Sequence, residues 1–170
     1  YKAAVLNAAA DGCLVDGESD ILRVGDHSIE TGAQLMARVL SQRRKGWAGR
    51  GAYQEPACPN PDDAQPLPVS WALATLEALT SASRVICYGI LMPKDDVDDG
   101  ILYVKVRDMK GDRIDLNALH RTTRESARKY QRSSLRHVDL LLSIRGTYAR
   151  VALVPSELDG GNITQDSARI

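Results

Sequence analysis

The C-terminal stretch from residue 135 to residue 170 constrains the fold more than any other part of the chain. It contains two apolar runs, residues 140–144 and 151–154, which are rich in Leu, Ile and Val. Each run is bounded by turn-forming residues and is too short for a core helix, so each is predicted to be a buried strand. Residues 145–150 join the runs, and Pro155 is expected to end the second strand because proline cannot donate to a sheet ladder.

Four short motifs lie in this stretch: residues 138–143 (VDLLLS), the Gly146-Thr147 pair, residues 151–155 (VALVP) and residues 162–165 (NITQ). An apolar hairpin of this kind, followed by a proline and an N-I-(S/T)-Q segment, resembles the target recognition domain of type I restriction–modification specificity (S) subunits. Two residues depart from the family pattern, since Val138 and Ala149 stand where it usually has glycine. If Ala149 adopts a positive φ, it strains the loop. Gly146 is expected to supply the backbone geometry of the turn and Thr147 to cap it.

The N-terminal third has the pattern of two helices. Residues 1–10 are helical in pattern and are followed by Gly12, and a second helix is predicted over residues 29–47, with Ser28 as its N-cap. The second helix carries one apolar stripe, made of Ile29, Met36, Leu40 and Trp47. Residues 2–15 and 30–47 resemble the end of the family's long spacer helix and the segment that follows it.

A proline-rich segment separates this helical region from the rest of the chain. Five of the seven prolines fall between residues 56 and 68, and such a segment is extended and does not fold by itself. We therefore expect three parts: a helical spacer region over residues 1–47, a linker over 48–67, and a recognition domain over 68–170. The pattern at both ends suggests a fragment of a longer polypeptide, with the recognition domain truncated at its C-terminus.

The charge is distributed unevenly although the formal net charge of the chain is zero. Residues 101–155 hold 12 Lys and Arg against 5 Asp and Glu, a net of +7, whereas residues 61–100 hold 2 against 7, a net of −5. A basic block of this size is typical of a phosphate-facing surface, and equally of an ordinary solvated face.

Residues 101–107 alternate in polarity and predict a strand. Leu102, Val104 and Val106 would form an apolar face, with Tyr103, Lys105 and Arg107 on a basic, aromatic face. A half-exposed sheet face gives the same pattern. The candidate DNA-binding residues are taken from this strand and from the 145–150 turn: Lys105, Arg107, Lys110, Arg145, Thr147 and Arg150.

The sequence contains no recognisable catalytic motif. The phosphate-binding loop, the dinucleotide-binding loop and the zinc-protease motif are all missing, and the three histidines are scattered. Three widely spaced cysteines without a pairing pattern fit a reducing cytoplasm, and no apolar run is long enough to span a membrane.

The family resemblance implies an α/β fold with a curved, mostly antiparallel sheet and a few helices, preceded by a helical spacer arm. It also implies double-stranded DNA as the ligand and no cofactor on this chain. In such complexes the methyltransferase (M) subunits bring S-adenosylmethionine, and the restriction (R) subunits bring ATP-driven, Mg-dependent cleavage. Two alternatives are open: the specificity segment of a fused restriction–methyltransferase, or a helical adaptor whose basic block is incidental.

Overall fold

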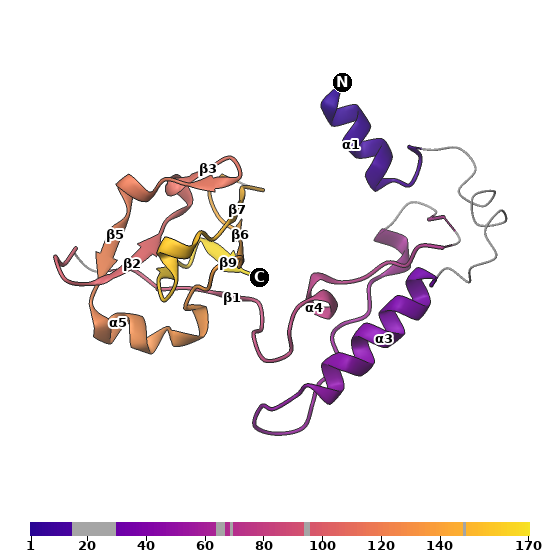
Figure 1. The fold of residues 1–170 in the computed structure, drawn as a ribbon, viewed down its shortest axis with the longest axis horizontal. Coiled ribbons are helices and arrows are strands. Elements are labelled where there is room, and N and C mark those ends of the chain that lie inside the picture. Colours follow the sequence, from indigo (N-terminus) through magenta and orange to yellow (C-terminus); the bar gives the residue numbers. More distant parts are fainter. Residues whose placement is uncertain (15–29, 64–66, 69, 94–95, 148) are drawn as a thin grey trace. The chain divides into compact units, whose positions relative to one another are not determined.

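The computed structural model describes residues 1–14, 30–63, 67–68, 70–93, 96–147 and 149–170. The chain divides into two compact units, Tyr1–Ser83 and Arg84–Ile170, here called unit 1 and unit 2. Unit 1 is drawn in indigo to magenta and unit 2 in rose to yellow in Figure 1. The sequence-based division at residue 68 stays a prediction.

Unit 2 contains a four-stranded antiparallel sheet built on the C-terminal stretch. Strand β6 (Leu140–Ser143) pairs with β7 (Val151–Leu153) on one side and with β9 (Ser167–Arg169) on the other, and β9 pairs with β1 (Cys87–Tyr88). The two predicted strands are therefore confirmed. Their complete burial is not, because β7 lies at the sheet edge and exposes Val151 and Leu153 on either side of buried Ala152.

A second sheet and a short hairpin complete the β-structure of unit 2. Strand β2 (Ile101–Val104) lies between β5 (His120–Thr122), which is antiparallel to it, and β8 (Asn162–Ile163), which is parallel. Strands β3 (Met109–Lys110) and β4 (Arg113–Ile114) form the hairpin. The predicted α/β class with mostly antiparallel strands is confirmed at this level.

The core of unit 2 lies where these three groups of strands meet. Leu141 and Ala152 come from the first sheet, Val104 and Ile163 from the second, and Met109 from the hairpin, and all five are buried. The chain has no Phe, so aliphatic side chains fill this core. Gly89 is needed beside it, because a Cβ there would lie 1.9 Å from the Ile163 carbonyl oxygen.

In unit 2 the short α-helix α5 (Arg124–Lys129) lies between β5 and the C-terminal stretch. Its N-cap is Thr123, whose hydroxyl accepts from the Ser126 N–H at 3.1 Å. The connections contain the 3₁₀ turns η2 (Val106–Asp108), η3 (Leu116–Ala118), η4 (Gln131–Ser133) and η5 (Ser156–Leu158).

The regular secondary structure in the described residues of unit 1 is helical. It contains α1 (Lys2–Ala10), α3 (Gly32–Lys45), α4 (Leu76–Leu79) and the 3₁₀ turn η1 (Pro61–Asp63). Helix α3 begins later than predicted because Thr31 and Gln34 form a reciprocal capping box, so Thr31 takes the role assigned to Ser28. Ser28 and Ile29 lie outside the described residues.

The proline-rich segment runs beside α3 and α4 within unit 1. The Ala57 carbonyl accepts from the Thr75 hydroxyl at 3.1 Å, and the Ala57 N–H donates to Glu77 at 3.3 Å. Glu55 forms an ion pair with Arg44 of α3. Except for η1, its described residues belong to no helix or strand.

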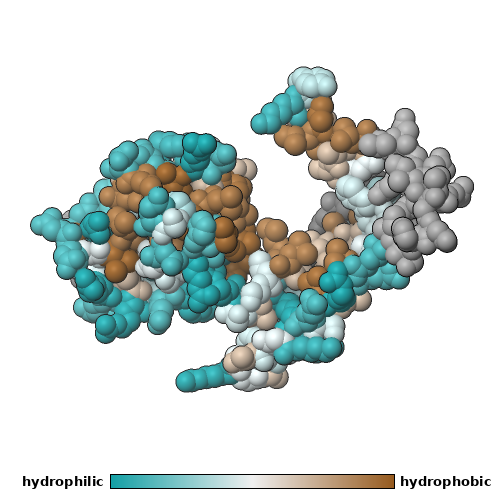
Figure 2. All heavy atoms as spheres, in the orientation of Figure 1, coloured by the Kyte–Doolittle hydropathy of each residue, from teal (hydrophilic) through white to brown (hydrophobic). Residues whose placement is uncertain are grey.

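Large apolar side chains of unit 1 are open to solvent. Leu76 and Leu79 of α4 are 54% and 58% exposed, and Leu6 of α1 is exposed as well. Figure 2 shows the apolar surface of α1 in brown. In the predicted stripe of α3, Met36 and Leu40 are half-buried rather than buried.

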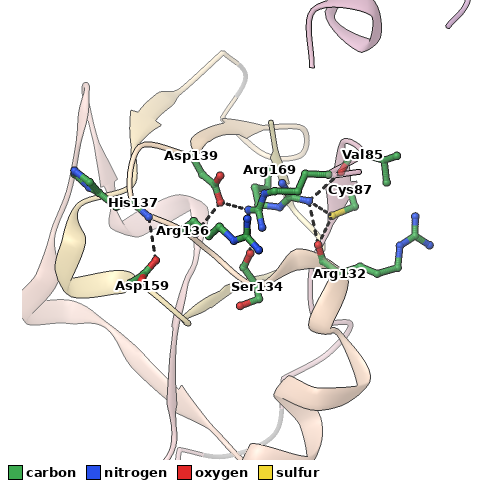
Figure 3. Close-up of polar contacts among 10 residues, drawn as sticks. Val85, Cys87, Arg132, Ser134, Arg136, His137, Asp139, Asp159 and Arg169 are labelled. Carbon is green, nitrogen blue, oxygen red and sulfur yellow. Dashed lines mark hydrogen bonds and ion pairs between the residues drawn. The ribbon is translucent and has the colours of Figure 1, made fainter. Parts of the chain in front are cut away.

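Polar residues buried in unit 2 hold its elements together (Figure 3). Arg169 of β9 is 2% exposed, and its Nη2 donates to the carbonyls of Val85 and Arg132, each at 3.0 Å. Asp139 accepts from Arg84 at 2.5 Å and from the Arg136 N–H at 2.8 Å. These contacts join β9 to η4 and to the segment before β1, and they join that segment to the residues just before β6, so the aspartate of the first family motif has a structural role.

The first residue of the NITQ motif, Asn162, also has a structural role. Asn162 is buried, its Nδ2 donates to the Tyr130 carbonyl at 3.2 Å, and its Oδ1 accepts from the Ser133 hydroxyl at 2.7 Å. Asn162 thereby ties the end of α5 and η4 to β8.

The two departures from the family's glycine pattern both fall at positive φ. Val138 has φ 64° and Ala149 has φ 58°, a region that L-residues other than Asn and Asp adopt at a cost. The Asp139 N–H bonds to the Arg136 carbonyl at 3.0 Å, so Val138 is the third residue of a tight turn, where glycine is favoured. The strain predicted for Ala149 is therefore confirmed, and Val138, being β-branched, is the more strained of the two.

Candidate nucleic-acid interface

Unit 2 has a hollow of about 500 Å³ between η2–β3 and the turn that joins β6 to β7. Five of the six predicted binding residues line it: Arg107, Lys110, Arg145, Thr147 and Arg150. Val106, Gly146 and Asp166 complete the lining. Residues from two separate predictions, the 101–107 segment and the 145–150 turn, are thus brought together by the fold.

The first wall of the hollow exists because β2 stops early. The strand predicted over residues 101–107 ends at Val104. Buried Asp108 accepts from the Lys105 N–H at 2.8 Å, and the Asp108 N–H donates to the Lys105 carbonyl at 3.0 Å, so the backbone closes into η2. Lys105 and Arg107 therefore do not lie on a strand face, and this part of the prediction is wrong.

Tyr103 also differs from its prediction. It was expected on an open basic face, but it is 1% exposed. Its ring is stacked on His120 of the paired strand, with centroids 5.9 Å apart, and Lys105 Nζ lies 5.4 Å from its centroid. Burial raises the pKa of Tyr103, with a further increase from the nearby Asp96 carboxylate.

The second wall is the β6–β7 turn. Gly146 has φ 78°, which confirms its predicted backbone role. The turn is closed by Ser143 rather than by Thr147, because the Ser143 hydroxyl donates to the Thr147 carbonyl at 2.6 Å and accepts from the Arg150 N–H at 2.9 Å. Thr147 offers its carbonyl to this contact, and Ser143 is a turn residue that sequence reasoning missed.

Arg150 connects the two walls. Its Nη1 donates to the carbonyls of Val106 and Met109, at 3.2 and 3.0 Å, and its side chain is half-buried. Arg150 thus stabilises the shape of the hollow as well as adding charge to it.

Lys105 lines a neighbouring hollow of about 330 Å³ with Thr164 and Gln165. The two hollows share Val106, Arg107 and Asp166, so Arg107 lies where both meet. The six predicted residues therefore line two adjacent hollows.

The larger hollow is electropositive. Four cationic side chains, Arg107, Lys110, Arg145 and Arg150, line it with one carboxylate, Asp166, which gives a net charge of +3 from 4 − 1. Cations converging on an open concavity attract polyanions such as a nucleic-acid backbone. Asp166 stands against this pattern, since a carboxylate repels phosphate and accepts from donors such as base amino groups.

Arg107 is held by a chain of side chains that starts outside the hollow. Its Nη2 contacts His120 Nε2, and His120 Nδ1 contacts an oxygen of Asp96. The His120 hydrogen bond is the main reason that the pKa of Asp96 is lowered. The sequence offered no sign of this chain, because its members lie far apart along it.

In the part of the chain that the structure describes, no group of three His, Cys, Asp or Glu side chains is placed to hold a metal ion. No described helix is both long and apolar enough to cross a membrane.

No family model matches the chain. A comparison with curated proteins finds the type I restriction enzyme EcoBI specificity subunit of Escherichia coli, which is 34% identical over 104 residues. The match covers 61% of this chain and 22% of that protein, so the chain spans about a fifth of the length of this relative. The resemblance to type I specificity subunits, inferred above from short motifs, is confirmed by this similarity.

Proposed function

We propose that this chain is part of a specificity subunit of a type I restriction–modification complex and recognises a DNA sequence without catalysing a reaction. The observation that carries the proposal is the electropositive hollow lined by Arg107, Lys110 and Arg145, on a chain similar to such a subunit. The absence of a catalytic motif in the sequence agrees with it.

In this proposal unit 2 belongs to a target recognition domain that starts near residue 68 and contains a curved sheet. Residues 1–47 form the spacer arm and 48–67 the linker. M and R subunits bind the assembled protein in the cytoplasm and bring S-adenosylmethionine, ATP and Mg, and the bound sequence directs their methylation and cleavage. The exposed Leu6 of α1 suits an arm that packs on further protein.

The test is the salt dependence of duplex DNA binding by the full chain. Each lost phosphate contact lowers the slope of log affinity against log salt by roughly 1. We expect Lys110→Ala and Arg145→Ala to weaken binding to all duplexes and to reduce this slope. Arg128→Ala is the matched control, because Arg128 is an exposed cation of α5 and lines neither hollow. Equal slopes for all three variants would overturn the proposed surface.

Two other functions give different results. A fused restriction–methyltransferase would transfer methyl groups to DNA without an added M subunit. A helical adaptor would show no salt-dependent DNA binding. Mapping the methylated positions in DNA exposed to the complete S–M complex identifies the recognised sequence.

A further inference from the structure

We propose that His120 is a positioning residue that orients Arg107 toward bound DNA, and that this orientation requires a neutral imidazole. The inference rests on the proposed DNA-binding function and extends it to a residue that lines neither hollow. It would make the contribution of Arg107 to DNA affinity depend on pH.

The hydrogen-bond chain determines the tautomer of His120. Arginine has donors only, so the His120 Nε2 that meets Arg107 Nη2 must accept. The single proton of the neutral ring then lies on Nδ1, which donates to Asp96. The other carboxylate oxygen of Asp96 accepts from the Arg121 N–H at 3.1 Å, which holds the start of the chain in place.

The ring of His120 is also held against rotation. His120 on β5 is the register partner of Tyr103 on β2, and their rings are stacked at 30°. Tyr103 is buried and has Lys105 near its ring. The charged or titratable described groups around His120 are Asp96, Tyr103, Lys105, Arg107, Asp108 and Arg121.

Protonation of His120 changes one contact more than the others. The imidazolium keeps its hydrogen bond to Asp96, but its new Nε2–H points at the guanidinium of Arg107, so two cationic donors face each other. Arg107, whose side chain is 64% exposed, then leaves this position. Its nearest remaining anion is the buried Asp108, 3.6 Å from Arg107 Nε.

The experiment measures the affinity of the full chain for a mixed-sequence DNA duplex at about pH 8 and about pH 5.5, on either side of the range in which histidine ordinarily titrates. We expect Arg107→Ala to weaken binding by roughly tenfold at the higher pH, the scale of one charge-assisted hydrogen bond, and by much less at the lower pH. Lys110→Ala is the control and should cause the same loss at both.

Two variants of His120 separate positioning from a structural role. His120→Gln keeps a neutral acceptor, so the effect of Arg107→Ala should become independent of pH and stay large. His120→Phe keeps the stacked ring but removes both nitrogens, so the effect of Arg107→Ala should be small at both pH values. An effect of Arg107→Ala that is the same at both pH values in wild-type protein, or that survives in His120→Phe, overturns the positioning role.

The chain of hydrogen bonds is tested separately by the nitrogen chemical shifts of His120 in the free protein. We expect a neutral ring protonated on Nδ1, and protonation on Nε2 would overturn the inference. Failure of the chain to bind any duplex would instead refute the proposed function, whatever the tautomer.

Discussion

Unit 2 buries a cluster of nine apolar residues that joins its three groups of strands, whereas the described residues of unit 1 bury three small apolar side chains, those of Pro56, Ala78 and Ala82. No residue of α1 or α3 is buried. Unit 2 therefore has a hydrophobic core of its own. In unit 1 the apolar stripe of α3 is only half covered, and hydrophobic stabilisation scales with the area removed from water. The hollow of unit 2 thus rests on a buried core, whereas the described helices of unit 1 have no comparable core beneath them.

The largest expected change in the free energy of unfolding comes from a substitution in the core of unit 2. Leu141 on β6 is fully buried, so Leu141→Ala should lower the free energy of unfolding by about 3 kcal/mol. The measurement is hydrogen exchange at the amides of β6 in the full chain. Leu40→Ala on half-exposed α3 is the matched control and should cost about 1 kcal/mol or less.

The tryptophans allow the two units to be followed separately. Trp47 and Trp71 both lie in unit 1, so their fluorescence reports on unit 1 while exchange in β6 reports on unit 2. We expect the fluorescence transition at lower denaturant. Coincident transitions, or equal losses from the two leucine variants, would break the comparison between the units.

The second effect concerns the buried amide of the NITQ motif. Asn162→Ala should destabilise unit 2 by about 2 kcal/mol, because it leaves the Tyr130 carbonyl and the Ser133 hydroxyl without their partner. Urea unfolding followed by circular dichroism measures this loss. Ser133→Ala removes one of the same hydrogen bonds and should cost less. A neutral Asn162→Ala would mean that the motif serves binding rather than folding.

The third substitution is expected to stabilise unit 2 rather than destabilise it. Val138 is 67% exposed with φ 64°, so Val138→Gly removes strain without losing packing and should stabilise unit 2 by about 1 kcal/mol. Ala149→Gly should change the stability of unit 2 by about a few tenths of a kcal/mol at most, because the freedom that glycine gains in the unfolded chain offsets the smaller strain at Ala149. Thermal unfolding of both variants tests the order, and a loss of stability in Val138→Gly would contradict it.

A fourth substitution should leave unit 2 almost unchanged. Leu40→Asp places a charge on the half-buried stripe of α3, so it should impair assembly with the M subunit while exchange protection in β6 stays at the wild-type level. Size-exclusion chromatography of the mixed subunits gives the first result. Normal assembly together with lost protection in β6 would place α3 in the core of the recognition domain.

The smallest expected effect concerns the titration of Asp96. The lowered pKa of Asp96 means that its contribution to stability is present above the ordinary aspartate pKa and is lost as the pH falls through the lowered folded-state value. His120→Phe removes the main cause, so the pKa of Asp96 measured by NMR should rise toward its ordinary value. An unchanged pKa would show that the Arg121 amide and the charge of Lys105 account for the lowering.

The elements that the sequence predicted correctly depend on local physics. The apolar runs at 140–144 and 151–154 form strands, because hydrophobic pattern and turn residues act within a few positions. The boundaries that were wrong depended on side chains that compete for backbone groups. Asp108 ended β2 early, and Thr31 began α3 later than Ser28 would have.

The sequence by itself determined the strand-rich class of unit 2, the positive charge of its central region, and the resemblance to specificity subunits, from whose glycine pattern residues 138 and 149 depart. Only the tertiary structure decided which cations share a surface, that Arg150 braces the hollow, and that Asp96 and His120 stand behind Arg107. The physical reason is the distance along the chain over which each effect acts. Propensity and turn geometry act over neighbouring residues, whereas the hollow is lined by side chains from η2, β3 and the β6–β7 turn, which meet only when the core closes.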